Sequence, residues 1–307
     1  DIGLSAIDKA TNGFKPSTLN IVVGASGAGK SVILTNWAAE IYKRKYNVLF
    51  FSLEMPMTQV ISRFISRELC IDYNRFYNGK LTEEEEIILN NKLPGILGKR
   101  SDEGILSNDD SFFIINTNFD SPDVSYVEEM VRKYNKMYGH VDVVFVDYLK
   151  NMKSKEIVKS GGSEWAHSGA CAEGLRNLAA NYGLTIFTAQ QLNRSGLEKS
   201  RKTLSNSPEN FEANQEDMSA SQNAFHAADS VIAFAPDREN YRMYFKLTKG
   251  RDFRFEPFVV NYYPNFNRII DPLIDDTPFM LSPIAGQLNA DHQLPIAEDD
   301  SDFGDEF

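Results

Sequence analysis

The stretch Gly24-Ala25-Ser26-Gly27-Ala28-Gly29-Lys30-Ser31 decides the fold, because it has the form G-x-x-x-x-G-K-S of a phosphate-binding loop. An apolar run of strand length precedes it at 19–23, and a helical pattern follows it at 32–39. Strand, glycine-rich loop and helix are the context in which this pattern cradles phosphate. The stretch is therefore predicted to bind a nucleotide; the alternative is a glycine-rich turn that binds nothing.

The chemistry expected of this loop follows from its residue types. Three glycines let the backbone turn its N–H groups inward around phosphate oxygens, and the start of the helix adds a partial positive charge. Lys30 is placed to reach the β- and γ-phosphates, and Ser31 to bind Mg²⁺. The expected ligands are therefore ATP and Mg²⁺.

Length and composition bound the fold class. The chain has 307 residues and is 42% hydrophobic, enough for one large α/β domain or two small ones. No run approaches the ~20 apolar residues of a membrane span, and no signal peptide is visible, so no membrane partner is expected. Cys70 and Cys171 lie in helical patterns and are expected to be buried free thiols, as in a reducing cytoplasm.

The charge balance argues against a protein that coats DNA broadly. The formal net charge is −11, and the last ten residues are rich in acids. Local basic loops inside a channel remain compatible with this balance. The first residue is Asp rather than Met, so we expect the sequence to be a fragment or a processed chain.

Strand and helix patterns alternate along the chain, which predicts a mostly parallel sheet covered by helices. Strands are expected at 19–23, 48–52, 112–115, 141–147, 184–189, 230–234, 243–248 and 258–262, the last three as antiparallel neighbours at one sheet edge. Helices are expected at 30–43, 57–69, from a capping box at Thr82 and Glu85 to about 93, from 121 onward, and at 171–180. Loops are expected at 99–110 and 150–162.

Three polar side chains at strand ends offer the remaining parts of a nucleotide-hydrolysing site. Asp147 ends an apolar strand and is the candidate metal carboxylate; its alternative is a solubilising strand end or a helix cap. Glu54 follows the second strand and is the candidate general base, or else a surface loop residue. Gln191 is the candidate γ-phosphate sensor, or else a polar strand end.

The order of elements and several short stretches resemble the RecA-type domain of replicative DNA helicases of the DnaB-like family, especially those of bacteriophages. The resemblance covers about 2–263. Its motifs are 2–16, 24–31, Ser52-Leu53-Glu54-Met55, Val146-Asp147-Tyr148-Leu149, Ala189-Gln190-Gln191-Leu192-Asn193-Arg194, and Lys249-Gly250-Arg251, which is similar to the family's K-x-R.

This resemblance implies a RecA-like P-loop NTPase core over residues 1–270, with antiparallel strands at one edge. It implies that Lys30 and Ser31 bind ATP and Mg²⁺, that Glu54 activates water and that Asp147 supports the metal. It further implies that Gln191 couples the γ-phosphate to DNA-binding loops. Two departures from the family are expected: residues 1–307 do not include the N-terminal domain or the linker helix, which in relatives docks on the adjacent subunit, and 196–219 does not align.

By the same resemblance, Lys249 and Arg251 act on the ATP of a neighbouring subunit in a homo-hexamer. The place of Arg251, after a late strand and in a turn made by Gly250, suits a side chain that projects from the sheet edge. The alternative is a surface arginine paired with Asp252 or Glu256.

Two basic groups follow strand ends on the expected nucleotide side of the sheet, where the family's central-channel loops lie. We expect them to hold single-stranded DNA through its phosphates; charge runs are otherwise solvated surface. The candidate residues are Lys150, Lys153, Lys155, Lys159, Arg194, Lys199, Arg201 and Lys202.

Residues 271–307 are rich in proline and acids and are expected to be an extended or disordered tail. Acids interleaved with Phe303 and Phe307 suit a hook for a basic, apolar groove on a replication partner. The alternative is a tail that only aids solubility.

The resulting hypothesis is an ATP-dependent replicative DNA helicase, a hexameric ring that translocates on single-stranded DNA and unwinds duplex at the fork. The family implies 5′–3′ polarity, a primase or a helicase loader as partner, and the host bacterial cytoplasm if a phage encodes the protein. Two alternatives stay open: a RecA-like recombinase or ATPase, and a nucleotide-dependent replication scaffold without unwinding activity.

Overall fold

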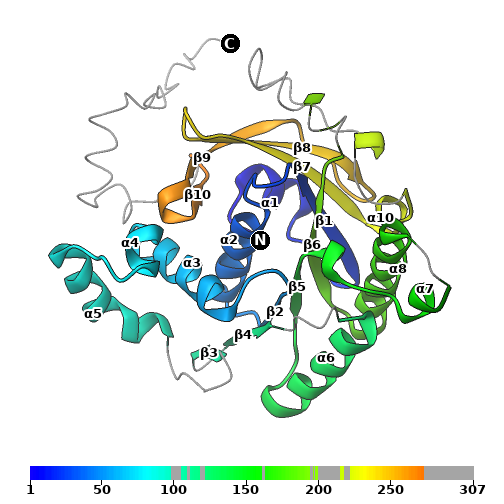
Figure 1. Ribbon diagram of the computed structural model, residues 1–307, viewed down its shortest axis with the longest axis horizontal. Coiled ribbons are helices and arrows are strands. Elements are labelled where there is room, and N and C mark those ends of the chain that lie inside the picture. Colours follow the sequence, from blue (N-terminus) through cyan, green and yellow to red (C-terminus); the bar gives the residue numbers. More distant parts are fainter. Residues whose placement is uncertain are drawn as a thin grey trace, which may run out of the picture.

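A single ten-stranded sheet runs through the molecule, with helices on both faces (Figure 1). The strand order is β10-β9-β8-β7-β1-β6-β5-β2-β4-β3. The structure is a computed structural model, and it describes residues 1–97, 105–108, 111–117, 122–160, 163–193, 196, 198–199, 215–217 and 222–272.

Six neighbouring strands form the parallel core, and antiparallel strands extend it at both edges. The parallel strands are β1 (Thr18–Gly24), β2 (Val48–Ser52), β4 (Ser111–Thr117), β5 (Val143–Asp147), β6 (Thr185–Gln191) and β7 (Ser230–Asp237). The antiparallel strands are β3 (Ile105–Asn108), β8 (Arg242–Gly250), β9 (Phe258–Tyr263) and β10 (Arg268–Ile270). The predicted fold class is confirmed: a mostly parallel α/β sheet with antiparallel edge strands.

Helices divide the core into two layers, one on each face of the sheet. Residues of α6 (Val124–Tyr138), α8 (Glu164–Tyr182) and α10 (Gln222–Ala227) pack in one cluster. Residues of α1 (Ser5–Thr11), α2 (Lys30–Lys43) and α3 (Met57–Leu69) pack in the other.

Successive strand residues alternate between these two clusters. In β5, Val144 and Val146 belong to the first and Phe145 to the second, as the pleat of a strand requires. Because both faces are covered, β5 is buried along its whole length.

A helical extension packs on α3 at the side of the sheet. It consists of α4 (Tyr73–Tyr77) and α5 (Glu83–Leu97). The capping box predicted for α5 is confirmed, because the Glu85 N–H donates to Thr82 Oγ1 at 3.2 Å and the Thr82 N–H donates to Glu85 Oε2 at 3.0 Å. The helix ends at Leu97 rather than near 93.

The two predicted loops were partly wrong. Within 99–110, the short strand β3 pairs antiparallel with β4, and four residues are too few to show a strand pattern in the sequence. The predicted loop 150–162 overlaps the 3₁₀ turn η1 (Leu149–Asn151) and contains α7 (Lys155–Ser160). Tertiary contacts fix this segment, since the Ser154 N–H donates to His167 Nδ1 of α8 at 3.1 Å.

Two further 3₁₀ turns are η3 (Gln215–Asp217) and η4 (Pro264–Phe266). Both cysteines are buried and free, as predicted. Among the residues described, no helix is long and apolar enough to span a bilayer.

The sheet domain includes Asp271, whose carboxylate accepts from the Ser5 N–H at 2.5 Å. The division of the chain at 270 and the nature of the tail stay predictions, since residues 273–307 lie outside the described part.

Candidate nucleotide-binding site

Four adjacent parallel strands bring the predicted phosphate-binding and hydrolytic residues to the carboxyl end of the sheet. The register pairs Gly24 at the end of β1 with Gln191 at the end of β6, and Ser52 at the end of β2 with Asp147 at the end of β5. The carboxyl edge of such a sheet is where α/β proteins bind ligands. The structure therefore collects the phosphate loop, Gln191, Asp147 and the turn after β2.

The phosphate loop has the backbone that its sequence predicts. Gly27 and Gly29 have φ of 71° and 106°, in the left-handed region that favours glycine. Gly29 caps the start of α2, and the crest at Ser26 and Gly27 is exposed. The N–H groups of the loop and of the first turn of α2 are thus available to an anion.

Lys30 is held inside the site. Its side chain donates to the Ala25 carbonyl at 3.0 Å and its Nζ lies 5.6 Å from the centre of the Tyr148 ring. Burial lowers the pKa of Lys30, and the negative charges of Glu54 and Asp147 oppose that shift. A phosphate at the loop would give this ammonium a stronger acceptor than the carbonyl.

Asp147 is fully buried, and within the described chain neither carboxylate oxygen makes a well-formed hydrogen bond. Burial raises its pKa to about 6, while the nearby Ser31 hydroxyl opposes the shift. The charge of Glu54 also raises this pKa, and Arg63 and Lys30 lower it. Carboxylate and hydroxyl oxygens are the hard donors that Mg²⁺ prefers, so this pair fits a magnesium site.

Glu54 is exposed, and hydrogen bonds of the neighbouring residues fix the turn in which it lies. Ser52 Oγ donates to the Met55 carbonyl at 2.6 Å, and the Leu53 N–H donates to the Asp147 carbonyl at 2.8 Å. Asn151 Nδ2 donates to the Leu53 carbonyl at 3.0 Å. The turn is therefore fixed to β5 while the Glu54 carboxylate stays open to solvent.

Gln191 is joined to the rest of the site by two contacts. Its Nε2 donates to the Tyr148 hydroxyl at 3.3 Å, and the next residue, Leu192, donates its N–H to the Gly24 carbonyl at 3.2 Å. The end of β6 is thus tied both to the segment after Asp147 and to the phosphate loop.

Sequence reasoning missed two residues that contact the loop from the edge strands. Arg238, in the β7–β8 turn, donates to the Gly27 carbonyl at 2.5 Å. The Tyr262 hydroxyl lies near Gly29, and burial raises the pKa of Tyr262 against the charges of Arg238 and Arg63. No local pattern marks either residue, because the hairpin register alone brings them there.

Lys249 and Arg251 lie at the opposite edge of the sheet, since Gly250 pairs with Ser230 at the start of β7. Arg251 donates to Asp229 Oδ1 at 2.8 Å, rather than pairing with Asp252 or Glu256 as the alternative had it. The Arg251 side chain remains 45% exposed.

Lys249 donates to the carbonyls of Phe225 and His226, at 2.7 and 2.9 Å. Burial, followed by the charge of Arg251, lowers the pKa of Lys249, and Asp229 opposes the shift. Neither basic residue is placed near the phosphate loop of its own chain.

The basic residues predicted to bind DNA are only partly described. Lys150 and Lys153 are exposed after β5. Lys155 pairs with Asp123 at 2.7 Å, and Lys199 with the buried Asp217 at 2.8 Å. Arg194, Arg201 and Lys202, and the side chain of Lys159, lie outside the described residues.

Comparison with known families assigns the chain. Residues 1–243 match the model of the DnaB-like helicase C terminal domain, and the chain belongs to that family. It is 29% identical over 196 residues to a probable replicative DNA helicase of Trieres chinensis, and 29% identical over 198 residues to replicative DNA helicase DnaB of Geobacillus stearothermophilus. Each alignment covers 63% of this chain and 39% of the relative, so the chain spans about two fifths of these proteins.

Solved structures share the fold. One solved ATPase domain aligns with a TM-score of 0.74 and 16% identity over 88% of this chain and 90% of that one. A structure of a DnaB-like replicative helicase and its interactions with primase gives the same score and identity over 88% of this chain and 61% of that one. The fold is that of the RecA-like helicase ATPase domains.

Proposed function

We propose that this chain is the ATP-hydrolysing motor domain of a replicative DNA helicase. The observation that carries the proposal is the buried Asp147 carboxylate, which lies beside Ser31 and Lys30 at the foot of a phosphate loop. An uncompensated buried carboxylate is costly, and such a group is kept where a cation or a reaction needs it.

Each site residue has a role that its position supports. Lys30 neutralises charge on the transferring phosphoryl group, and Glu54, open to solvent, accepts a proton from the attacking water. Ser31 and Asp147 would hold Mg²⁺, which would supply positive charge to the phosphate oxygens. Gln191, tied to Tyr148 and to the loop, reports on the γ-phosphate.

The trans role of Lys249 and Arg251 belongs to the same proposal. Both residues lie at the opposite end of the strands from their own phosphate loop, so they are too far away to contact a nucleotide there. In a ring, they would instead face the nucleotide site of the neighbouring subunit. Arg251 would exchange Asp229 for phosphate oxygens, which a guanidinium binds with the same fork geometry.

The partners proposed for the motor follow from this assignment. Single-stranded DNA passes the exposed lysines after β5, and translocation with 5′–3′ polarity separates the duplex. The active form is a homo-hexamer, a primase or a loader is the protein partner, and the setting is cytoplasmic.

A forked DNA substrate tests the proposal. The full-length protein is expected to unwind the fork with ATP and Mg²⁺. A Lys30→Ala version lacks the loop ammonium, so its rates of ATP hydrolysis and unwinding are expected to fall by orders of magnitude. A protein that hydrolyses ATP and binds DNA without unwinding supports the scaffold alternative. ATP-dependent filaments on DNA support the recombinase alternative. Hydrolysis by Lys30→Ala within a factor of two of wild type overturns the site.

A further inference from the structure

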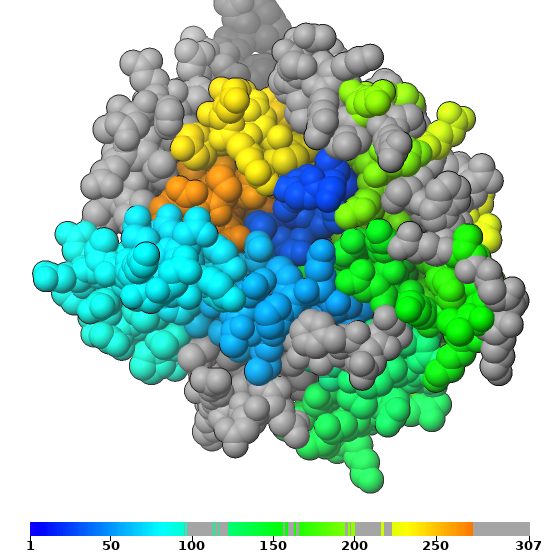
Figure 2. Space-filling view, in the orientation of Figure 1, coloured from blue at the N-terminus to red at the C-terminus, as the bar shows by residue number. Residues whose placement is uncertain are grey.

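A cavity lies at the other end of α2 from the phosphate loop. It has a volume of about 210 Å³, is partly open to solvent, and is lined by the N-terminal segment, α2, α3 and β10. In Figure 2, residues early in the chain (blue) reach the surface between the late strands (yellow and orange) and the region after β2 (light blue). We name this 210 Å³ cavity the α2 cavity.

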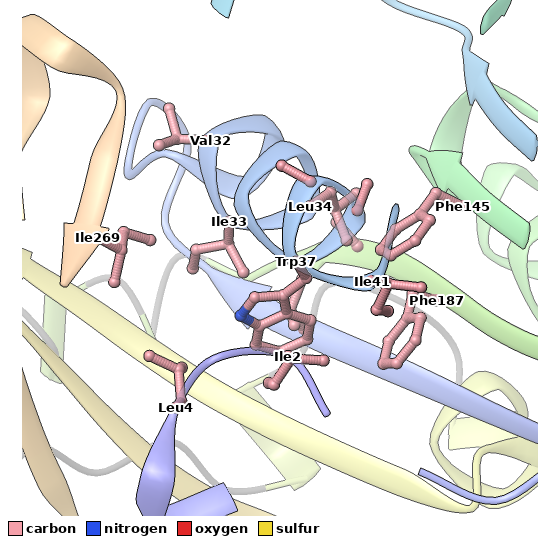
Figure 3. Packing of buried hydrophobic residues seen from close by; sticks show 14 of the residues in the cluster. Ile2, Leu4, Val32, Ile33, Leu34, Trp37, Ile41, Phe145, Phe187 and Ile269 are labelled. Atoms are coloured by element: carbon pink, nitrogen blue, oxygen red, sulfur yellow. The ribbon is translucent and has the colours of Figure 1, made fainter. Parts of the chain in front are cut away.

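One wall of the α2 cavity is apolar. Ile2, Leu4, Trp37 and Ile269 line it, and Figure 3 shows these side chains packed around the indole of Trp37. A cavity of about 150 Å³ accommodates a benzene ring, whereas drug-sized ligands need about 300 Å³ or more. The α2 cavity therefore suits one aromatic side chain rather than a nucleotide.

The same wall contains a polar group without an acceptor. The indole Nε1 of Trp37 is buried, has no hydrogen-bond partner among the described residues, and lies on the side of the ring that faces Leu4 and Ile269. An unpaired buried donor is unfavourable, so an occupant that brings a carbonyl or carboxylate oxygen is favoured.

The charged side chains that line the cavity are mostly basic. Four basic and two acidic residues line it: Lys43, Arg44, Arg67 and Arg268, with Glu40 and Asp271. Arg67 forms ion pairs with Glu40 and Glu68, and Lys43 pairs with Glu68 at 3.0 Å. Arg44 reaches only as close as 3.8 Å to the exposed Asp1, a weak surface pair that another carboxylate can replace.

The described chain ends beside this cavity, since Asp271 lines it and Pro272 is the last residue described. Phe303 follows Pro272 by 31 residues and has Asp302 before it and Asp305 after it. Random-coil statistics give about 30 Å for the average end-to-end distance of 31 residues, so Phe303 is within reach of the cavity.

We propose that the α2 cavity is the docking site for the chain's own acidic C-terminal segment. The ring of Phe303 occupies the cavity, and the carboxylates that flank it lie near Arg44. The contact would join the C-terminal segment to the far end of the helix that begins at the phosphate loop. The proposal does not depend on the assigned activity, because its residues take no part in the nucleotide site.

Site-specific photo-crosslinking in the full chain tests this contact. Benzoylphenylalanine at position 303 is expected to crosslink to peptides that contain Leu4, Trp37 or Ile269, as mapped by mass spectrometry. The same group at Phe279, also in the C-terminal segment, is the matched control and is expected to give a much lower yield there. Equal yields from both positions, or crosslinks from 303 elsewhere only, overturn the proposal.

Charge variants provide the second arm. Arg44→Glu is expected to lower the crosslink yield about fivefold, the effect of losing one favourable surface pair, while Lys92→Glu on α5 is expected to leave it unchanged. In the unmodified cavity, raising the salt from about 50 mM to about 500 mM is expected to lower the yield as well. A yield insensitive to both changes overturns the proposal.

Two more readouts separate the remaining outcomes. In a Trp165→Phe background, Trp37 is the single tryptophan, and Phe303→Ala is expected to change its emission. An unchanged emission contradicts docking beside Trp37. In a mixture of light and heavy isotope-labelled chains, products are expected within one chain; hybrid products would show docking between copies and contradict the intramolecular form.

Discussion

The carboxyl group of Asp147 is buried among the ends of four strands, and its negative charge there opposes folding of the ligand-free chain. We expect Asp147→Asn to raise the free energy of unfolding by about 1–3 kcal/mol, because the amide removes the buried charge at nearly constant volume. The measurement is thermal unfolding without nucleotide or Mg²⁺. ATP hydrolysis by the same variant is expected to be lost.

The pH dependence of that difference is a sharper test. The pKa of Asp147 rises from its ordinary 3.8 to about 6 in the folded chain, so folding favours the protonated form. The contribution of Asp147 to the free energy of unfolding therefore falls as the pH rises between these two values. The gap in Tm between Asp147→Asn and wild type is expected to be larger at pH 7 than at pH 4.5. A constant gap would exclude a titrating Asp147.

Glu54→Gln separates binding from hydrolysis. The amide keeps the size of the side chain but cannot accept a proton from water, so ATP should bind normally while turnover falls by about 10²–10⁴-fold. Fluorescent-nucleotide binding and single-turnover hydrolysis measure the two effects. Glu128→Gln, on α6 away from the site, is the control. Loss of binding with unchanged turnover per bound ATP would exclude Glu54 as the base.

Site residues could be predicted from the sequence where a local pattern or a position at a strand end marks them. The glycines and Lys30 of the loop follow from one contiguous pattern, and Asp147 and Gln191 from their places at strand ends. Arg238 could not be predicted, because its contact with Gly27 depends on a hairpin more than 200 residues further along the chain.

Helices α2 and α3 are joined by a buried charged network. Arg67 of α3 forms ion pairs with Glu40 of α2 and with Glu68, and donates from Nε to Asn36 Oδ1 at 2.8 Å. The Asn36 amide in turn donates to the Asn267 carbonyl beside β10 at 2.7 Å. Three elements that border the α2 cavity thus share one set of polar contacts.

Arg67→Met should be strongly destabilising, because it leaves carboxylates without their buried partner. We expect the free energy of unfolding to fall by about 3 kcal/mol, and Tm by about 6–12 °C. The control is Arg132→Met on α6, whose ion pair with Glu128 is exposed, and its Tm should stay close to that of wild type. Similar Tm values for both variants would contradict the proposed role of the network.

Elements were predictable where pattern and length agreed. The bounds of α2, α3 and β2 match the expected ranges residue for residue, since core spacing and strand length both marked them. The strand β3 and the helix α7 were missed because each is short and is fixed by a neighbour, β4 in one case and His167 of α8 in the other.

On the scale of the whole molecule, Arg251 tests how subunits cooperate. Arg251→Ala and Lys30→Ala proteins are each expected to hydrolyse ATP poorly, since arginine fingers contribute about 10³–10⁵ in rate. Mixed in one ring, some interfaces combine an intact loop with an intact Arg251, and ATPase activity should partly recover. Steady-state hydrolysis against mixing ratio measures this. No recovery in mixtures shown to co-assemble would exclude the trans role.

The sheet architecture could be predicted from the sequence more fully than the contacts of surface side chains could. Alternating strand and helix patterns gave the parallel sheet, and the late strand runs gave its antiparallel edge. The partners of exposed charges did not follow: Arg251 pairs with Asp229, 22 positions earlier in the chain, rather than with a neighbour in sequence.

The strand order also has a consequence for folding during synthesis. The first strand, β1, lies between β6 and β7, which begin at Thr185 and Ser230. During synthesis the phosphate loop therefore leaves the ribosome long before either flanking strand exists. At about 5–20 residues per second, β6 follows the phosphate loop by roughly 8–32 s, and until then the apolar strand β1 has no native neighbour. Nascent chains halted before residue 185 should therefore recruit chaperones and fail to retain ATP.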